Sequence, residues 1–231
     1  MEPTVVGMLG PQDSSPHLQC LAVERLSLRI FVLRVVGVGQ IAHGTQRVEH
    51  HVKILVSVDF FTVPTIRFQV LFVFLVLAHE RRRILHFGVT AHPTAEWTAQ
   101  QLRDAFPWDT APCYLLRDRD RIFGDEFTKQ VKDMGIQEVL AAPRSPWPRA
   151  YIERLIGTPR HECLDHVIVF HQASLYRHVQ SFLAYYHASR THLSLAKDTP
   201  KPRPVQPAER GAVVAIPQVG GLHHRYERRA A

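Results

Sequence analysis

Three acidic residues in this sequence are placed where carboxylates could bind divalent metal ions together. Asp59 follows the apolar residues 54–58, Asp118 follows shortly after the apolar residues 113–116, and Glu153 lies 35 positions after Asp118. Carboxylates that share a site repel one another unless cations neutralise them, and hard oxygen ligands suit Mg²⁺ or Mn²⁺. The pattern therefore predicts a metal-binding triad of Asp59, Asp118 and Glu153.

A site of this kind performs phosphoryl transfer when it holds two ions. Ions about 3.5–4 Å apart activate the attacking oxygen and stabilise the leaving one. Each acid has a simpler interpretation when taken alone: Asp59 as a turn former, Asp118 as the partner of a neighbouring arginine, and Glu153 as a solvated helix residue. The prediction therefore depends on the elements that bring the three together.

The first part of the core is predicted to contain three strands. Residues 54–58 form a buried strand that ends at Asp59 and is followed by a turn through Pro64. Residues 68–77 and 84–89 form the next two. Strands that follow one another directly predict an antiparallel meander.

Helices and strands alternate in the second part. The predicted helices span residues 94–105, 125–134, a stretch from 145 that carries Glu153, and 174–187, and the predicted strands span 113–116 and 137–140. This order predicts an α/β fold with a five-stranded mixed sheet flanked by helices. If the first and fourth strands are neighbours, Asp59 and Asp118 emerge at the same edge of the sheet.

The segments around the three acids resemble a known family. They read Val-Ser-Val-Asp59-Phe-Phe, Leu-Leu-Arg-Asp118-Arg-Asp-Arg-Ile-Phe-Gly and Ala-Tyr-Ile-Glu153-Arg-Leu-Ile-Gly, and are similar to the acidic motifs of insertion-sequence DDE transposases with a retroviral-integrase-type core. A fourth segment, residues 185–195, resembles the tyrosine, arginine-x-histidine and leucine signature that closes such cores. The resemblance covers about residues 51–231.

This resemblance implies a ribonuclease H-like fold and a polynucleotidyl transferase that cleaves DNA strands and joins them. It also implies two Mg²⁺ or Mn²⁺ ions per active site and a homo-oligomer that acts on mobile-element ends and target DNA. Asp120 competes with Asp118 for the second acidic position. Asp118 is preferred because it lies nearer the strand end and because Phe123 supplies the family's aromatic residue five positions later.

Basic residues flank the acidic motifs, as DNA binding requires. The formal net charge is +7 and the sequence pI is about 9.7, which favours a polyanionic partner. The predicted nucleic-acid contacts are Arg117, Arg119, Arg144, Arg149, Arg154 and Arg160. Arg160 lies seven residues after Glu153, on the same helix face. For Arg190 and His192, a structural pair at a helix end is favoured over DNA contacts.

The flanks of the core carry weaker signals. Residues 1–50 show no sustained period and are expected to form a poorly ordered N-terminal segment, and residues 51–199 are expected to form the catalytic core. Four prolines between positions 200 and 207 predict an extended basic tail over residues 200–231. Pro159 should kink or end its helix near Gly157 and redirect Arg160.

Two alternatives to an active transposase follow from the same residues. Relatives usually carry a helix-turn-helix ahead of the core, and residues 1–50 do not resemble one. Together with Pro159, this suggests a truncated, catalytically inactive DNA-binding transposase remnant. A nuclease of the same fold is the second alternative. The longest apolar run, residues 70–78, is far shorter than the ~20 residues that span a bilayer, and no signal peptide is evident, so a cytoplasmic location is expected.

Overall fold

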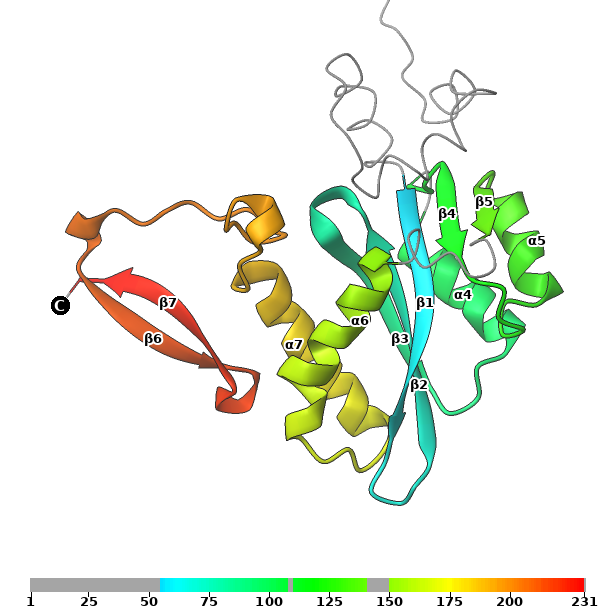
Figure 1. Ribbon diagram of the computed structural model, residues 1–231, viewed down its shortest axis with the longest axis horizontal. Coiled ribbons are helices and arrows are strands. Elements are labelled where there is room, and N and C mark those ends of the chain that lie inside the picture. Colours follow the sequence, from blue (N-terminus) through cyan, green and yellow to red (C-terminus); the bar gives the residue numbers. More distant parts are fainter. Residues whose placement is uncertain (1–54, 108–109, 141–149, 231) are drawn as a thin grey trace, which may run out of the picture.

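The computed structural model describes residues 55–107, 110–140 and 150–230 (Figure 1). Its centre is a five-stranded sheet in the order β3-β2-β1-β4-β5, with helices on both faces. The predicted α/β class and the five-stranded mixed sheet are therefore confirmed. The N-terminal segment predicted over residues 1–50, together with Arg144 and Arg149, lies outside the described residues.

The predicted meander is present as β1 (Leu55–Pro64), β2 (Val70–Ala78) and β3 (Arg83–Thr90), which pair antiparallel. The prediction that β1 ends at Asp59 is wrong. Asp59 pairs with Leu75, and the pairing continues to Pro64 opposite Val70. A single acidic residue does not end a strand when the neighbouring strand supplies the backbone hydrogen bonds. Asp59 therefore lies within β1 rather than at its end.

Two further strands extend the sheet in parallel. β4 (Tyr114–Arg117) pairs with β1, and β5 (Gln137–Leu140) pairs with β4. Parallel neighbours need a crossover. The helix α5 (Asp125–Asp133) connects β4 to β5, and α4 (Ala95–Ala105) connects β3 to β4. Thr94 caps α4 as predicted, because its side chain accepts a hydrogen bond from the Trp97 backbone N–H.

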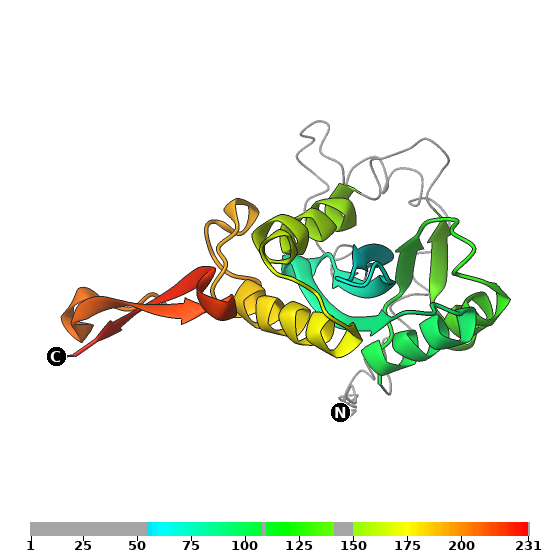
Figure 2. The same ribbon diagram turned by 90° about the horizontal axis from the view of Figure 1, so that it is seen from below.

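The helices cover the sheet in two pairs. Both views in Figures 1 and 2 show α4 and α5 together, apart from α6 (Ala150–Glu162) and α7 (Gln172–Ala188). One buried core joins alternate β1 residues to α6 and α7 and includes Phe61, Val63 and Phe182. The other joins the intervening β1 residues to α4 and α5. None of the helices in the described residues is long and apolar enough to cross a membrane.

Pro159 does not interrupt α6, contrary to the prediction. The helix runs from Ala150 through Pro159 to Glu162. Proline removes one backbone hydrogen bond, at a cost of about 3 kcal/mol. Packing holds the helix on both sides of it, because Ile152 and Leu155 are buried before Pro159 and Cys163 is buried just after the helix end. Tertiary contacts therefore override the local penalty.

The extended tail predicted for residues 200–231 is only partly present. After the proline-rich segment, β6 (Ala212–Gln218) and β7 (His223–Arg229) form an antiparallel hairpin. Gly220 and Gly221 adopt positive φ in its turn, a conformation open to glycine. The prolines, which argued against regular structure, end at Pro207 except for Pro217 within β6. Figures 1 and 2 show that the hairpin projects beyond α7, away from the five-stranded sheet.

Candidate active site

The parallel pairing of β1 with β4 places two of the predicted carboxylates side by side. Ser57 is aligned with Leu116. Two residues further along each chain come Asp59 and Asp118, and residues two apart in a strand point to the same face. Neighbouring strands lie about 4.8 Å apart. The continuing register therefore sets Asp118 beside Asp59 at the point where β4 has just ended.

Side-chain alternation along β1 decides which face carries Asp59. Phe61 and Val63 belong to the core beneath α6 and α7, and Val56 and Val58 belong to the core beneath α4 and α5. Asp59 has the parity of Phe61 and therefore faces the α6 side. It is 6% exposed, and its Oδ1 accepts a hydrogen bond of 2.8 Å from the Phe60 backbone N–H.

Glu153 lies in the first turn of α6 and is exposed. Further along the helix, Arg160 donates to the Thr62 carbonyl of β1 at 2.9 Å, and its guanidinium lies 5.5 Å from the centre of the Phe61 ring. Seven helical residues lead back about 10 Å to Glu153, and three strand residues lead back about 10 Å to Asp59.

Figure 1 shows α6 and β1 running in the same sense along each other. Because Arg160 contacts Thr62, the first turn of α6, which carries Glu153, lies at about the level of Asp59 along β1.

Asp59 lies on the α6 side of the sheet, and Glu153 lies in the first turn of α6. Among the described residues, no three His, Cys, Asp or Glu side chains form a group that could hold a metal ion. The donor set is nevertheless purely carboxylate, which is the chemistry that Mg²⁺ and Mn²⁺ take. Asp59, Asp118 and Glu153 therefore fit such ions by donor type and by face.

Asp120, the alternative to Asp118, lies in the turn beyond β4. Its backbone N–H donates to Asp118 Oδ1 at 3.1 Å, and its own Oδ1 accepts from the Ile122 backbone N–H at 3.1 Å. It is exposed. The place beside Asp59 in the parallel register belongs to Asp118, and Asp120 shapes the turn that follows.

Arg117 is buried, which corrects its assignment as a DNA contact. Its Nε donates to Glu138 Oε1 at 2.6 Å, and its guanidinium lies 5.4 Å from the centre of the Phe123 ring on the α5 side of the sheet. The side chain is 8% exposed. Because Arg117 directly precedes Asp118, strand alternation sends it to the opposite face, and the sequence already contained that signal.

The remaining predicted arginines differ in exposure. Arg160 is used within the fold, as described above, so α6 presents it to β1 rather than to an outside ligand. The redirection of Arg160 by Pro159 does not occur. Arg119, in the turn after β4, and Arg154, next to Glu153, are exposed. These two remain available to contact a phosphate beside the acids.

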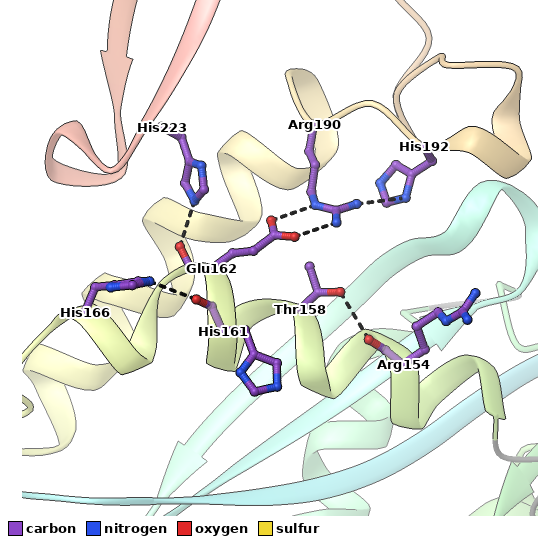
Figure 3. Close-up of polar contacts among 8 residues, drawn as sticks. All are labelled: Arg154, Thr158, His161, Glu162, His166, Arg190, His192 and His223. Carbon is purple, nitrogen blue, oxygen red and sulfur yellow. Dashed lines mark hydrogen bonds and ion pairs between the residues drawn. The ribbon is translucent and has the colours of Figure 1, made fainter.

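Arg190 joins the end of α7 to the end of α6, which is the structural role that was favoured. Its Nε and Nη2 donate to the two carboxylate oxygens of Glu162 at 2.7 and 2.6 Å, and Nη1 lies 3.2 Å from His192 Nδ1 (Figure 3). Such two-point contacts fix orientation as well as distance. Glu162 was not identified from the sequence, because 28 residues separate it from Arg190.

The hairpin contributes to the same junction. His223 Nε2 lies 2.7 Å from the Glu162 carbonyl oxygen, and its ring stacks on Tyr185 with centres 4.4 Å apart and planes at 9°. Figure 3 shows that His223, at the start of β7, and Arg190, just after α7, both contact Glu162. Residue Glu162 therefore connects α6, α7 and the hairpin.

A buried polar pair lies close to Asp59 on β1. Ser57 Oγ and His79 Nε2 are 2.6 Å apart, and both side chains are buried. Burial, together with the positive charge of Arg82, lowers the pKa of His79 to about 4. The imidazole is therefore neutral at pH 7. The sequence placed His79 in a polar corner and did not indicate this pairing.

Comparison with known proteins agrees with the resemblance seen in the motifs. Residues 134–200 match the family described as integrase core domain. A chain of the simian T-cell lymphotropic virus intasome superposes with a TM-score of 0.53 at 12% identity, covering 75% of this chain and 66% of that one. The HTLV-2 integrase catalytic core domain, in its trimeric form with magnesium, gives 0.50 at 11% identity, covering 64% and 93%. No curated protein matches the sequence.

At these identities the superpositions establish the fold. The described core has the ribonuclease H-like fold of retroviral integrase catalytic cores, and the matched segment includes Glu153 and Arg190. The chain spans 66% of the length of the simian virus intasome chain.

The contact between Glu162 and Arg190 should stabilise the protein measurably. Both side chains are about a quarter to a third exposed, and the contact is bidentate. In a double-mutant cycle of Glu162→Gln and Arg190→Gln, we expect a coupling energy of about 1–2 kcal/mol in urea unfolding, within the range for contacting residues. The same cycle on Arg225 and Glu227 of the hairpin provides a comparison. A coupling near zero for Glu162 and Arg190 would contradict the assigned role.

Two buried histidines should make stability depend on pH. Burial, with the charges of nearby arginines, lowers the pKa of both His79 and His192 to about 4. An unfolded histidine titrates near 6.5, so between pH 6.5 and about 4 the unfolded state binds more protons. The free energy of unfolding should therefore fall as the pH drops through this window. His79→Gln should flatten the dependence measured by urea titration, and the exposed His224→Gln should leave it unchanged.

Proposed function

We propose that this chain, which has an integrase core segment on a retroviral-integrase fold, is a DDE polynucleotidyl transferase that cleaves DNA strands and joins them. The observation that carries the proposal is the parallel register that sets Asp118 beside Asp59 on the face covered by the Glu153 helix. Neither residue 59 nor residue 118 lies within the matched family segment, so this geometry is independent support.

Asp59 and Asp118 would both contact two Mg²⁺ or Mn²⁺ ions, and Glu153 would complete one of the sites. When bound, such ions activate the attacking oxygen and stabilise the leaving oxygen. Asp59 is held rigidly by its strand, and Asp118 by the start of its turn. Glu153 is carried in the first turn of α6, next to the buried residues Ile152 and Leu155.

The DNA substrate would lie across the acidic face. Arg119 and Arg154 directly follow Asp118 and Glu153 in the sequence and are exposed, which suits them to contact backbone phosphates. In strand cleavage, water would attack a backbone phosphorus and break its bond to the 3′-oxygen, which leaves as a 3′-hydroxyl. In strand transfer, such a 3′-hydroxyl would attack a phosphorus of the target DNA and displace the target's 3′-oxygen, so no covalent protein–DNA bond is needed. We infer a homo-oligomer acting on paired mobile-element ends, because the similar HTLV-2 core forms a trimer and the simian virus chain belongs to an intasome.

The first experiment is cleavage and joining of plasmid and labelled linear DNA in Mg²⁺ or Mn²⁺. Glu153→Gln and Asp59→Asn should each lower both activities by roughly a hundredfold or more, because they remove metal-ion stabilisation worth several kcal/mol. Glu126→Gln, an exposed acid on α5 at the opposite face, is the matched control.

The outcomes separate the possible functions. Metal-dependent cleavage without joining indicates a nuclease of this fold. DNA binding without any cleavage, in wild type and variants alike, would refute the proposal and identify an inactive DNA-binding remnant.

DNA affinity should depend steeply on salt, and Arg119 should contribute to that dependence. Each phosphate contact adds about one to the slope of log affinity against log salt concentration. Arg119→Gln should therefore reduce the slope by about 1 in fluorescence anisotropy with a labelled duplex. Lys132→Gln removes a charge at the far end of α5 and should leave the slope unchanged. Equal slopes for all three proteins would exclude Arg119 as a phosphate contact.

A further inference from the structure

A small cavity of about 100 Å³ lies between α6, α7 and the end of β2. Three arginines from three different elements line it: Arg82 from the short helix η1 (Glu80–Arg82), Arg154 from α6, and Arg190 after α7. Among the described residues that line it, none is acidic, and the other walls are mainly Leu77, Leu155 and Tyr186. The cavity thus combines a confined space with concentrated positive charge.

The positive potential at this place is visible in a neighbouring histidine. His192 lines the cavity, and after burial the charges of Arg190 and Arg82 are the causes that lower its pKa to about 4. The carboxylate of Glu162 binds Arg190 but is not among the cavity walls. Glu162 therefore offsets the charge of Arg190 from outside the described walls of the cavity.

His192 also supplies a hydrogen-bond donor. Arg190 has only donors, so the contact between its Nη1 and His192 Nδ1 requires that Nδ1 accepts. In the neutral imidazole the proton then resides on Nε2. Nε2 is buried and has no hydrogen-bond partner among the described residues. A buried donor without an acceptor is unfavourable, so an acceptor at this place would stabilise the protein.

We propose that this cavity binds a tetrahedral oxyanion of the phosphate class. Phosphate offers several acceptor oxygens to guanidinium groups, and arginine recognises it through paired N–H donors. The small volume suits one such group and excludes a nucleotide. Arg154 lines the cavity from α6, together with Arg190 and His192.

The cavity lies next to the candidate active site. Leu77 pairs with Ser57, two residues before Asp59, and Arg154 directly follows Glu153. A bound oxyanion would therefore connect the start of α6 to η1 and α7 and hold the first turn that carries Glu153. Its source would be either a free phosphate ion or a phosphate of the DNA backbone. Only the second source rests on the proposed function.

Inorganic phosphate is the probe for the site itself. At constant ionic strength and pH 7.5, phosphate in place of chloride should raise the midpoint of thermal unfolding of the wild-type chain by a few degrees once its concentration exceeds the dissociation constant. Arg154→Gln and Arg82→Gln should abolish the shift, and Arg154→Lys should retain part of it. Arg119→Gln, which removes an exposed arginine outside the cavity, should leave the shift intact.

The reference midpoint in chloride controls for misfolding, because each variant is compared with itself. A shift of equal size in all variants would indicate general salt effects and overturn the proposal. The absence of any phosphate shift in the wild type would overturn it as well. The shift of the unfolding midpoint is measured without DNA cleavage, in the wild type and in the variants alike, so an inactive enzyme does not affect it.

A competition experiment identifies the source of the oxyanion. If phosphate at constant ionic strength weakens duplex DNA binding by the wild type severalfold but not by Arg154→Gln, the cavity takes a backbone phosphate. If phosphate stabilises the protein without affecting DNA binding, the cavity takes a free ion. Either result supports the oxyanion site. Both are interpretable only after phosphate has been shown to raise the unfolding midpoint of the wild type.

Discussion

The relative position of Asp59 and Asp118 depends on the register of two parallel strands, β1 and β4. β1 and β4 pair so that Ser57 is opposite Leu116, and the next position of the same parity holds Asp59 and Asp118. A shift of one residue would send one of these carboxylates to the other face of the sheet. The register is held by the buried residues around it, among them Leu115 and Val58, which are 0% and 2% exposed.

The third carboxylate depends on how α6 docks. Ile152 and Leu155 bury one side of the helix, Arg160 binds the β1 backbone, and Glu162 binds Arg190. These contacts explain why a proline within the helix is tolerated, since together they exceed the loss of one backbone hydrogen bond. Ile152 and Leu155 lie next to Glu153, and Arg160 and Glu162 lie toward the other end of the helix. Contacts therefore anchor α6 near both of its ends.

Arginine serves several physical purposes in this chain, and position in the fold separates them. Arg117 is buried against Phe123, and Arg190 makes a two-point contact with Glu162. Arg119 and Arg154 are exposed near the acids. In the net charge of +7, Arg117 and Arg190 are already offset by the glutamates that they contact, Glu138 and Glu162, so neither adds to the excess positive charge. Exposure, rather than composition, identifies the residues that can meet a phosphate.

The sequence by itself determined the order of the core elements and the sheet class, because hydrophobic periodicity and helix caps are local properties. The alternation of side chains along a strand also indicated that Arg117 lies on the face opposite Asp118. Only the tertiary structure decided that β1 continues past Asp59, that α6 passes through Pro159, and that residues 212–229 form a hairpin. It also joined Glu162 to Arg190 and gathered three arginines around one cavity. These outcomes arise from contacts between segments far apart in the chain, whose energies outweigh local preferences and leave no local pattern.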